Sequence, residues 1–232
     1  PAFIGSGPTV GDATTVADAR AVLTRWGVEV PASVQAALAL GSGVVAPGDA
    51  RLASVENRVV AAPAQSLAAA AALAGTECDV RMLGDALEGE AREVAAAQAA
   101  LALSVQAALR TGDAPVLLVS GGELTVTRRG DGIGGPNAEF CLALALALNG
   151  AAGIHAIACD TDGVDGAAEV AGAVIGPDTP TGPGAAKALD LNDAHSYFAR
   201  VGGQVVTGPT LTNVNDFRAI LVMPPGPRAK YA

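Results

Sequence analysis

The chain has 232 residues, which is enough for one large domain or two small ones. Its formal net charge is −9 and no Lys/Arg cluster exceeds the pair Arg128 and Arg129, so nucleic-acid binding is not expected. Half of the residues are hydrophobic but only 3% are aromatic, which favours α/β layers with alanine-rich helices over an all-β sandwich. The longest apolar block, residues 140–148, is too short to cross a membrane, so no membrane partner is expected.

The cysteines and the first residues give further expectations. Cys78, Cys141 and Cys159 show no spacing typical of a zinc site or a disulfide framework. We expect free thiols in a reducing compartment and therefore a cytoplasmic location. The sequence begins in an apolar run without Met, which suggests that an earlier portion of a larger domain precedes it.

The first predicted helix follows a capping box that starts at Thr15. Its apolar residues recur at helical spacing, Gly27 is expected to end it, and Trp26 is predicted to lie in the core. A second short helix is predicted over residues 31–40, and a loop over residues 41–50.

An alternation of strands and helices then begins. Strands are predicted over residues 59–62 and 78–83, and helices over residues 64–74 and 90–110. This alternation is typical of βαβ units and predicts a parallel sheet. The short polar segment 111–114 is the best candidate for a domain boundary, which would separate residues 1–110 from residues 111–232.

The rest of the chain is predicted to form a second α/β domain. Strands are predicted over residues 116–119, 124–127, 154–159, 170–175, 204–206 and 217–223, and helices over residues 137–148 and 192–200. The segment 124–127 alternates apolar residues with threonines, as a half-exposed antiparallel strand does. A glycine-rich loop over residues 128–135 precedes Pro136, which suits the first helical position, and Asn192 is expected to cap the later helix.

Four polar turns that contain glycine follow predicted strands or open predicted helices. They cover residues 120–123, 130–137, 160–166 and 207–216. In α/β folds, ligands bind beyond the carboxyl ends of the strands, so we expect these turns to converge on one site.

The acidic turn supplies the predicted catalytic groups. Asp160, Asp162 and Asp165 follow a buried strand within six residues, and carboxylates this close raise one another's pKa unless a cation offsets them. A divalent metal is therefore the natural partner. We predict that all three aspartates are catalytic and that Asp160 and Asp162 hold Mg²⁺.

The other polar groups of the four turns are predicted to bind substrate or phosphate. Backbone amides at a helix start bind anions, and hydroxyl and amide side chains can hold a small polyol or its carboxylate. The predicted residues are Ser120, Gly121, Gly122, Glu123, Gly134, Gly135, Asn137, Glu139, Thr207, Gly208, Thr210, Asn213, Asn215 and Asp216. With a nucleotide and Mg²⁺, these features describe phosphoryl transfer.

A dinucleotide site is the alternative that the glycines raise. Gly130, Gly132 and Gly135 match the G-x-G-x-x-G pattern. That fingerprint requires a buried parallel strand before the glycines, whereas the segment here is polar, alternating and ends in two arginines. His155 and His195 are each predicted to be structural.

The four turns resemble, in order, the signatures of the MOFRL domain of the glycerate 2-kinases, some of which are labelled hydroxypyruvate reductases. The motifs are Ser120-Gly121-Gly122-Glu123, Gly134-Gly135-Pro136-Asn137-Ala138-Glu139-Phe140, Asp160-Thr161-Asp162-Gly163-Val164-Asp165-Gly166, and Thr207-Gly208-Pro209-Thr210 with Thr212-Asn213-Val214-Asn215-Asp216. Residues 4–92 resemble the end of the family's amino-terminal domain. The resemblance implies an incomplete Rossmann-like parallel-sheet domain over residues 1–110 and a MOFRL-like α/β domain with a mixed sheet over residues 111–232.

The resemblance also implies an activity. The family phosphorylates D-glycerate to 2-phosphoglycerate with ATP and Mg²⁺, in a cleft between two α/β domains. The front of the family protein, with a glycine-rich serine motif and a lysine expected to be catalytic, is not in this chain, so the chain alone is predicted to be nearly inactive. The family loop usually has Arg and Gln where Pro136 and Ala138 stand, which removes a cation that could contact phosphate or carboxylate.

Two other functions stay open at this point. One is an NAD(P)-dependent hydroxypyruvate reductase, and the other is a non-catalytic ligand-binding module. The expected partners are glycerate and a nucleotide, and a homodimer is among the oligomeric states left open.

Overall fold

The computed structural model describes residues 7–41, 43–166 and 168–226. Its contacts divide the chain into two compact units, Pro1–Val60 and Ala61–Ala232. The predicted boundary after residue 110 lies inside the second unit, between two strands that pair with each other. The proposal that residue 110 separates two domains of the family therefore remains a prediction.

The first unit contains two short helices. Helix α1 (Val16–Arg25) begins with the predicted capping box, in which Thr15 and the carboxylate of Asp18 bond each other's amides. Helix α2 (Ala32–Leu40) and the 3-10 helix η2 (Ala50–Leu52) follow. None of the described residues of this unit is buried, and Trp26 is 72% exposed, so its predicted core position is wrong. Helical spacing defines an apolar face, but burial requires a second surface to cover it.

The strand predicted over residues 59–62 is not formed. These residues run irregularly into helix α3 (Pro63–Ala74), and the side chain of Val60 is 82% exposed. β-branched residues favour a strand only where a neighbouring strand shares its hydrogen bonds, and no described strand lies alongside this segment.

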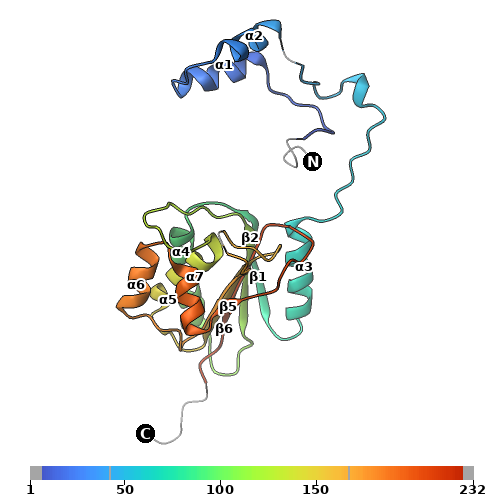
Figure 1. Ribbon diagram of the computed structural model, residues 1–232. Coiled ribbons are helices and arrows are strands. Elements are labelled where there is room, and N and C mark those ends of the chain that lie inside the picture. The colour runs from blue at the N-terminus through green and yellow to red at the C-terminus, as the bar shows by residue number, and fades with distance from the viewer. Residues whose placement is uncertain (1–6, 42, 167, 227–232) are drawn as a thin grey trace, which may run out of the picture. The chain divides into compact units, whose positions relative to one another are not determined.

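The second unit is built on a mixed sheet, which Figure 1 shows between helices. The sheet has six strands in the order β1-β2-β6-β3-β4-β5. The strands are β1 (Asp79–Leu87), β2 (Val116–Gly122), β3 (Ile154–Asp160), β4 (Gly172–Ile175), β5 (Gln204–Val205) and β6 (Asp216–Val222). Strands β1 and β2 are parallel and are joined by helix α4 (Ala91–Ala108), which confirms the predicted βαβ unit. The other pairs are antiparallel, so the predicted α/β class with a mixed sheet is confirmed.

Helices cover the two faces of this sheet unequally. Helix α3 packs on β1 and β2, whereas α4, α5 (Pro136–Leu148), α6 (Pro183–Asp190) and α7 (Ala194–Val201) lie on the other side (Figure 1). Successive residues of β2 face opposite sides of the sheet. Gly121 lies next to Leu67 of α3, whereas Ser120 bonds Gln98 of α4 on the other side. Within the part of the chain that the structure describes, no helix is both long and apolar enough to span a membrane.

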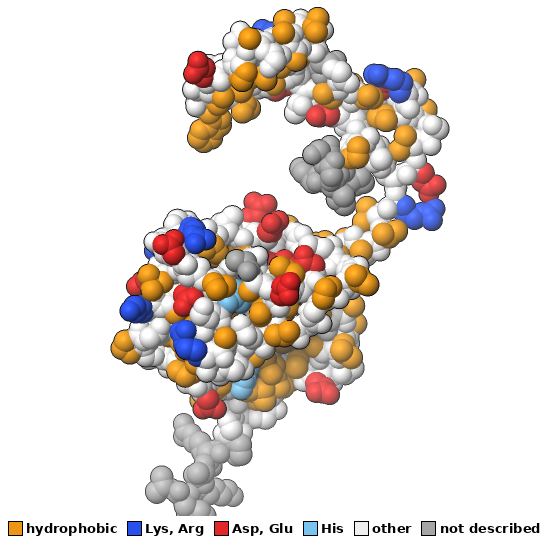
Figure 2. Space-filling model, viewed as in Figure 1, with side chains coloured by type: hydrophobic (Ala, Val, Ile, Leu, Met, Phe, Trp, Pro, Cys, Tyr) orange, Lys and Arg blue, Asp and Glu red, His pale blue; other side chains and the backbone are white. Residues whose placement is uncertain are grey.

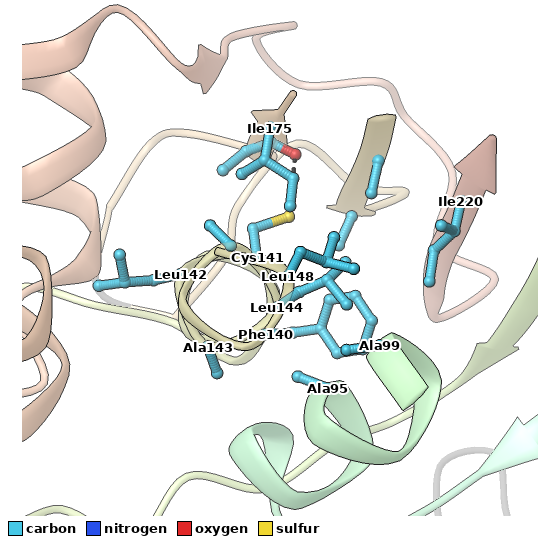
Figure 3. Packing of buried hydrophobic residues seen from close by; sticks show 14 of the residues in the cluster. Ala95, Ala99, Phe140, Cys141, Leu142, Ala143, Leu144, Leu148, Ile175 and Ile220 are labelled. Carbon is cyan, nitrogen blue, oxygen red and sulfur yellow. Dashed lines mark hydrogen bonds between the residues drawn. The ribbon is translucent and has the colours of Figure 1, made fainter. Parts of the chain in front are cut away.

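Helix α5 is the centre of the core. Leu and Ala alternate along it in a way that resembles a strand, but the segment is helical, as predicted. The helix begins at Pro136. Figure 3 shows Phe140 beside Ala95 and Ala99 of α4, with Leu142 on the opposite side of the helix. Small alanines let the two helices approach closely. Because α5 is covered on several sides, its sequence lacks the period of a surface helix.

Two further local predictions are wrong. Residues 124–127 do not form a strand, since Leu124 is buried and the segment makes only one isolated bridge. Helix α7 begins at Ala194, and Asn192 has a left-handed φ of 54° instead of capping it. Helix α6 was not predicted, because a Pro/Gly-rich segment can open a helix as well as form a loop.

Candidate functional site

Neighbouring strand ends bring the four predicted turns to one edge of the sheet. Asp216, at the start of β6, pairs in register with Gly122 at the end of β2 and with Asp160 at the end of β3. Asn137, in the first turn of α5, donates from Nδ2 to Asp216 Oδ1 at 2.7 Å. Figure 2 shows acidic side chains gathered on the upper part of this unit. We call Asp160, Asp162 and Asp216 the acidic edge.

Asp160, which ends β3, and Asp162, which follows it, are bonded mainly to nearby amides. Asp160 is half-buried and accepts a hydrogen bond from the amide of Asp162 at 3.0 Å. Asp162 accepts from the amide of Val164 at 2.8 Å and from Asn213 Nδ2 at 2.9 Å. Burial raises the pKa of Asp160 to about 6; the amide of Asp162 opposes this increase, and the charges of Asp162 and Asp216 add to it. A carboxylate whose pKa is raised by burial and by nearby negative charges favours a bound cation.

The acidic edge fits part of a magnesium site. In the described ranges, no group of three or more His, Cys, Asp and Glu side chains is arranged to hold a metal ion. Mg²⁺, however, is usually bound by one or two carboxylates together with water and substrate phosphates. Asp160 and Asp162 supply such a pair, and a bound cation would offset both the burial of Asp160 and the nearby charges of Asp162 and Asp216, which together raise the pKa of Asp160.

The loop that precedes β6 is fastened to the acidic turn. Thr161 Oγ1 donates to the carbonyl of Asn215 at 2.8 Å and accepts from the amide of Val214 at 2.9 Å. The φ of Gly163 is +97°, and a Cβ there would lie 2.3 Å from the carbonyl oxygen of Gly208. Glycine is therefore required where the two turns touch. Exposed hydroxyl and amide side chains stand beside the carboxylates as a result, and they belong to Thr207, Thr210, Asn213 and Asn215.

Asp165 lies buried beneath the start of α5. Its Oδ1 accepts from the amide of Asn137 at 2.9 Å and from Asn137 Nδ2 at 3.2 Å, and its Oδ2 accepts from the amide of Ala138 at 2.8 Å. His195 Nε2 lies 3.1 Å from Oδ2 and 2.8 Å from the Asp165 carbonyl. The first amides of α5 are thus bonded to Asp165 instead of being available to a phosphate. A catalytic role for Asp165 stays a prediction that these contacts disfavour.

The His195–Asp165 pair leads to a prediction of pH-dependent stability. Burial acts to lower the pKa of His195, but the hydrogen bond and charge of Asp165 raise it above its ordinary value. Such a group contributes stability that is fully present below its unfolded pKa of about 6.5 and is lost as pH rises through the folded pKa. We expect the unfolding free energy in urea to fall above about pH 6.5 more steeply for the wild type than for His195→Gln. Equal slopes would contradict this.

Two other predicted binding residues are buried among protein partners. Glu139 Oε1 accepts from Arg92 at 2.6 Å, and its Oε2 accepts from Asn192 Nδ2 at 2.9 Å. Ser120 Oγ accepts from Gln98 Nε2 at 3.3 Å. Glu139 thus joins α5 to α4 and to the turn before α7, whereas Ser120 holds α4 against β2. Because both side chains are buried, their substrate-binding roles remain predictions without an exposed group to support them.

The segment 120–123, which includes the last residues of β2, is packed closely against the end of β1. A Cβ at Gly122 would lie 2.2 Å from the amide nitrogen of Leu87, and one at Gly121 would lie 3.2 Å from the carbonyl oxygen of Asp216. Both glycines are buried, whereas Glu123 is exposed. Only Glu123 of this turn therefore presents a side chain to solvent.

The glycine-rich loop packs on the turn between α6 and α7. The amide of Gly130 donates to Asn192 Oδ1 at 3.0 Å, and the amide of Gly132 donates to the carbonyl of Leu191 at 2.9 Å. A Cβ at Gly134 would lie 2.7 Å from the carbonyl oxygen of Asn192. Because these glycines have no Cβ, residues 191–193 pack directly against the loop. The space beside the glycines is therefore filled by protein and not by a pyrophosphate. The dinucleotide alternative is therefore not favoured.

Substitution of Gly132 tests this packing. A Cβ there would lie 2.5 Å from Asp193 Cβ and 2.6 Å from the Leu191 carbonyl oxygen, so Gly132→Ala is expected to reduce the unfolding free energy in urea by about 1–3 kcal/mol. The matched control is Gly43→Ala, which meets no atom within 4 Å and should change it by less than about 0.5 kcal/mol. Retained stability in Gly132→Ala, together with loss of NADH binding, would support a dinucleotide loop instead.

Asn192 and Arg218, which were not among the predicted site residues, hold the parts of the site together. Asn192 joins the glycine-rich loop to Glu139, and Arg218 bonds both Asp216 and the Gly121 carbonyl. Residues two apart on a strand share a face, so the opposite charges of Asp216 and Arg218 in an apolar strand could have indicated a buried ion pair. The role of Asn192 had no comparable local signal.

Comparisons with known proteins identify the family of the chain. The sequence profile of the MOFRL family matches residues 116–216, and that of a domain of unknown function (DUF4147) matches residues 1–39. A putative hydroxypyruvate reductase of Agrobacterium vitis is 47% identical, covering 96% of this chain and 52% of its own length. A glycerate kinase of Macaca fascicularis is 30% identical, covering 95% of this chain and 68% of its own length. The chain belongs to the glycerate kinase family.

A solved structure of a glycerate kinase shares the fold. The crystal structure of glycerate kinase from Thermotoga maritima aligns with a TM-score of 0.82 at 30% identity, covering 96% of this chain and 54% of that chain. The resemblance inferred from the four motifs is therefore confirmed. The chain spans about half the length of the A. vitis and T. maritima relatives, 52% and 54% respectively.

Proposed function

We propose that the whole protein transfers a phosphoryl group from ATP to the 2-hydroxyl of D-glycerate, with Mg²⁺, and that residues 61–232 contribute the acidic edge of the active site. The observation that carries this proposal is the junction of the strand ends, where Asp160 and Asp162 adjoin exposed hydroxyl and amide groups. Membership of the glycerate kinase family supports the substrate class. A cytoplasmic location and the oligomeric state stay predictions.

Each group at the edge has a proposed task. Asp160 and Asp162 would hold Mg²⁺, which when bound neutralises developing charge on the phosphate oxygens. The hydroxyl and amide groups of the loop before β6 would bind glycerate or phosphate; they come from Thr207, Thr210, Asn213 and Asn215. To donate to the ligand, the hydroxyls of Thr207 and Thr210 would exchange their bonds to the carbonyls of Gly208 and Thr161. Catalysis of this kind depends on positioning and charge stabilisation.

A coupled ADP-release assay tests the proposal. The full-length protein is expected to release ADP only when D-glycerate and Mg²⁺ are both present, and to yield 2-phosphoglycerate. Absence of Mg²⁺-dependent turnover would count against the kinase and leave a ligand-binding module as the better function. Oxidation of NAD(P)H with hydroxypyruvate, followed at the nicotinamide absorbance, would indicate the reductase. Residues 1–232 alone are predicted to turn over far more slowly than the full-length protein.

A further inference from the structure

Arg218 is a fully buried cation behind the acidic edge. Its side chain has 0% exposure, although it is among the largest side chains of the unit. Nη1 donates to Asp216 Oδ2 at 2.9 Å, and Nη2 donates to the carbonyl oxygen of Gly121 at 2.6 Å. The guanidinium also lies over the ring of Phe140, at 5.8 Å from its centroid. One side chain thus connects the end of β2, the start of β6 and the first turns of α5.

Burying the charge of Arg218 costs free energy, which indicates that the arginine has a specific role at this position. A buried guanidinium is unfavourable unless it is paired and hydrogen-bonded, and an apolar side chain of similar volume is often no less stable. Nε of Arg218 has no hydrogen-bond partner among the described residues. Burial acts to lower the pKa of Arg218, while the carboxylate of Asp216 opposes that change. Stability alone therefore does not account for an arginine at this position.

Its contacts continue directly to the groups assigned to the site. The carboxylate of Asp216 bonds Arg218 through Oδ2 and Asn137 through Oδ1. Asn137 also bonds Asp165, which belongs to the turn that carries Asp160. The planar, forked guanidinium can fix a carboxylate and a carbonyl at the same time, which a lysine ammonium does with less geometric control.

We propose that Arg218 is a positioning residue of the acidic edge, holding the Gly121 carbonyl and the Asp216 carboxylate so that the ends of β2 and β6 keep their places beside Asp160. This inference rests on the proposed function, because it concerns the edge assigned to phosphoryl transfer. Arg218 is not a catalytic residue, since its contacts are with protein groups.

The test compares Arg218→Met and Arg218→Lys with Arg200→Met in the full-length protein. Arg200 is an exposed arginine over the ring of Tyr197 and serves as the control. Two measurements are made: glycerate-dependent ADP release, and hydrogen exchange by mass spectrometry. For Arg218→Met we expect kcat to fall roughly 10- to 100-fold with KM for glycerate changed less than about threefold. Exchange should accelerate only in peptides covering residues 118–123 and 212–218. Arg218→Lys should recover part of both effects.

The outcomes separate this inference from the proposed function. Wild-type protein without turnover would refute the kinase, and the exchange pattern would still decide the role of Arg218. Acceleration confined to the two strand ends supports positioning. Acceleration of hydrogen exchange that is spread evenly over the sheet overturns the positioning role of Arg218. Exchange and kcat that are both unchanged also overturn it. If Arg218→Met does not fold, the same criteria apply to Arg218→Lys, and failure of both variants to fold would also overturn it, because Arg218 would then act on global stability.

Discussion

Replacement of Asp160 by Asn is expected to reduce Mg²⁺-dependent phosphorylation of glycerate by roughly 10²- to 10³-fold. Asn has the same size and can still accept the hydrogen bond from the amide of Asp162, but it lacks the negative charge that would hold the cation. Because the pKa of Asp160 is about 6, protons should compete with Mg²⁺ below that pH. The Mg²⁺ concentration for half-maximal rate should therefore rise as pH falls through 6 in the wild type.

The control for this experiment is Glu169→Gln. Glu169 is an exposed acid four residues after Asp165, and no site group contacts it in the described structure, so its removal tests for a general effect of net charge. It should retain wild-type kcat and Mg²⁺ dependence. Full activity in Asp160→Asn, or an equal loss in both variants, would show that Asp160 does not hold the metal.

Replacement of Asp165 by Ala is expected to lower the free energy of unfolding by about 3–5 kcal/mol. Three amide hydrogen bonds and the contact with His195 would lose their acceptor, and the first amides of α5 would be buried without a partner. Urea denaturation measures the loss. Asp131→Asn, at a fully exposed acid, should change the free energy by less than about 0.5 kcal/mol.

Asp165→Asn separates the scaffold role from the predicted catalytic one. The amide side chain would place a donor against the backbone donors of Asn137 and Ala138, so stability should fall while the folded fraction keeps measurable turnover. Unchanged stability combined with loss of turnover would instead support Asp165 as a catalytic group.

Predictions succeeded where a signal lies within a few residues. The capping box at Thr15, the start of α5 at Pro136 and the βαβ unit around α4 each depend on local chemistry or periodicity. They failed where a partner surface decides, as for Trp26 and residues 59–62. Local preference cannot report whether another segment is present to cover a face or continue a sheet.

The sequence by itself determined the α/β class, the order of the four polar turns and the family to which they belong. Only the tertiary structure decided which polar residues face solvent and which are bonded inside the protein. Asp165 bonds His195, 30 residues later, and Glu139 bonds Arg92, 47 residues earlier. The physical reason is that burial and hydrogen-bond partners arise from packing between distant segments, whereas a motif records only which residues are adjacent along the chain.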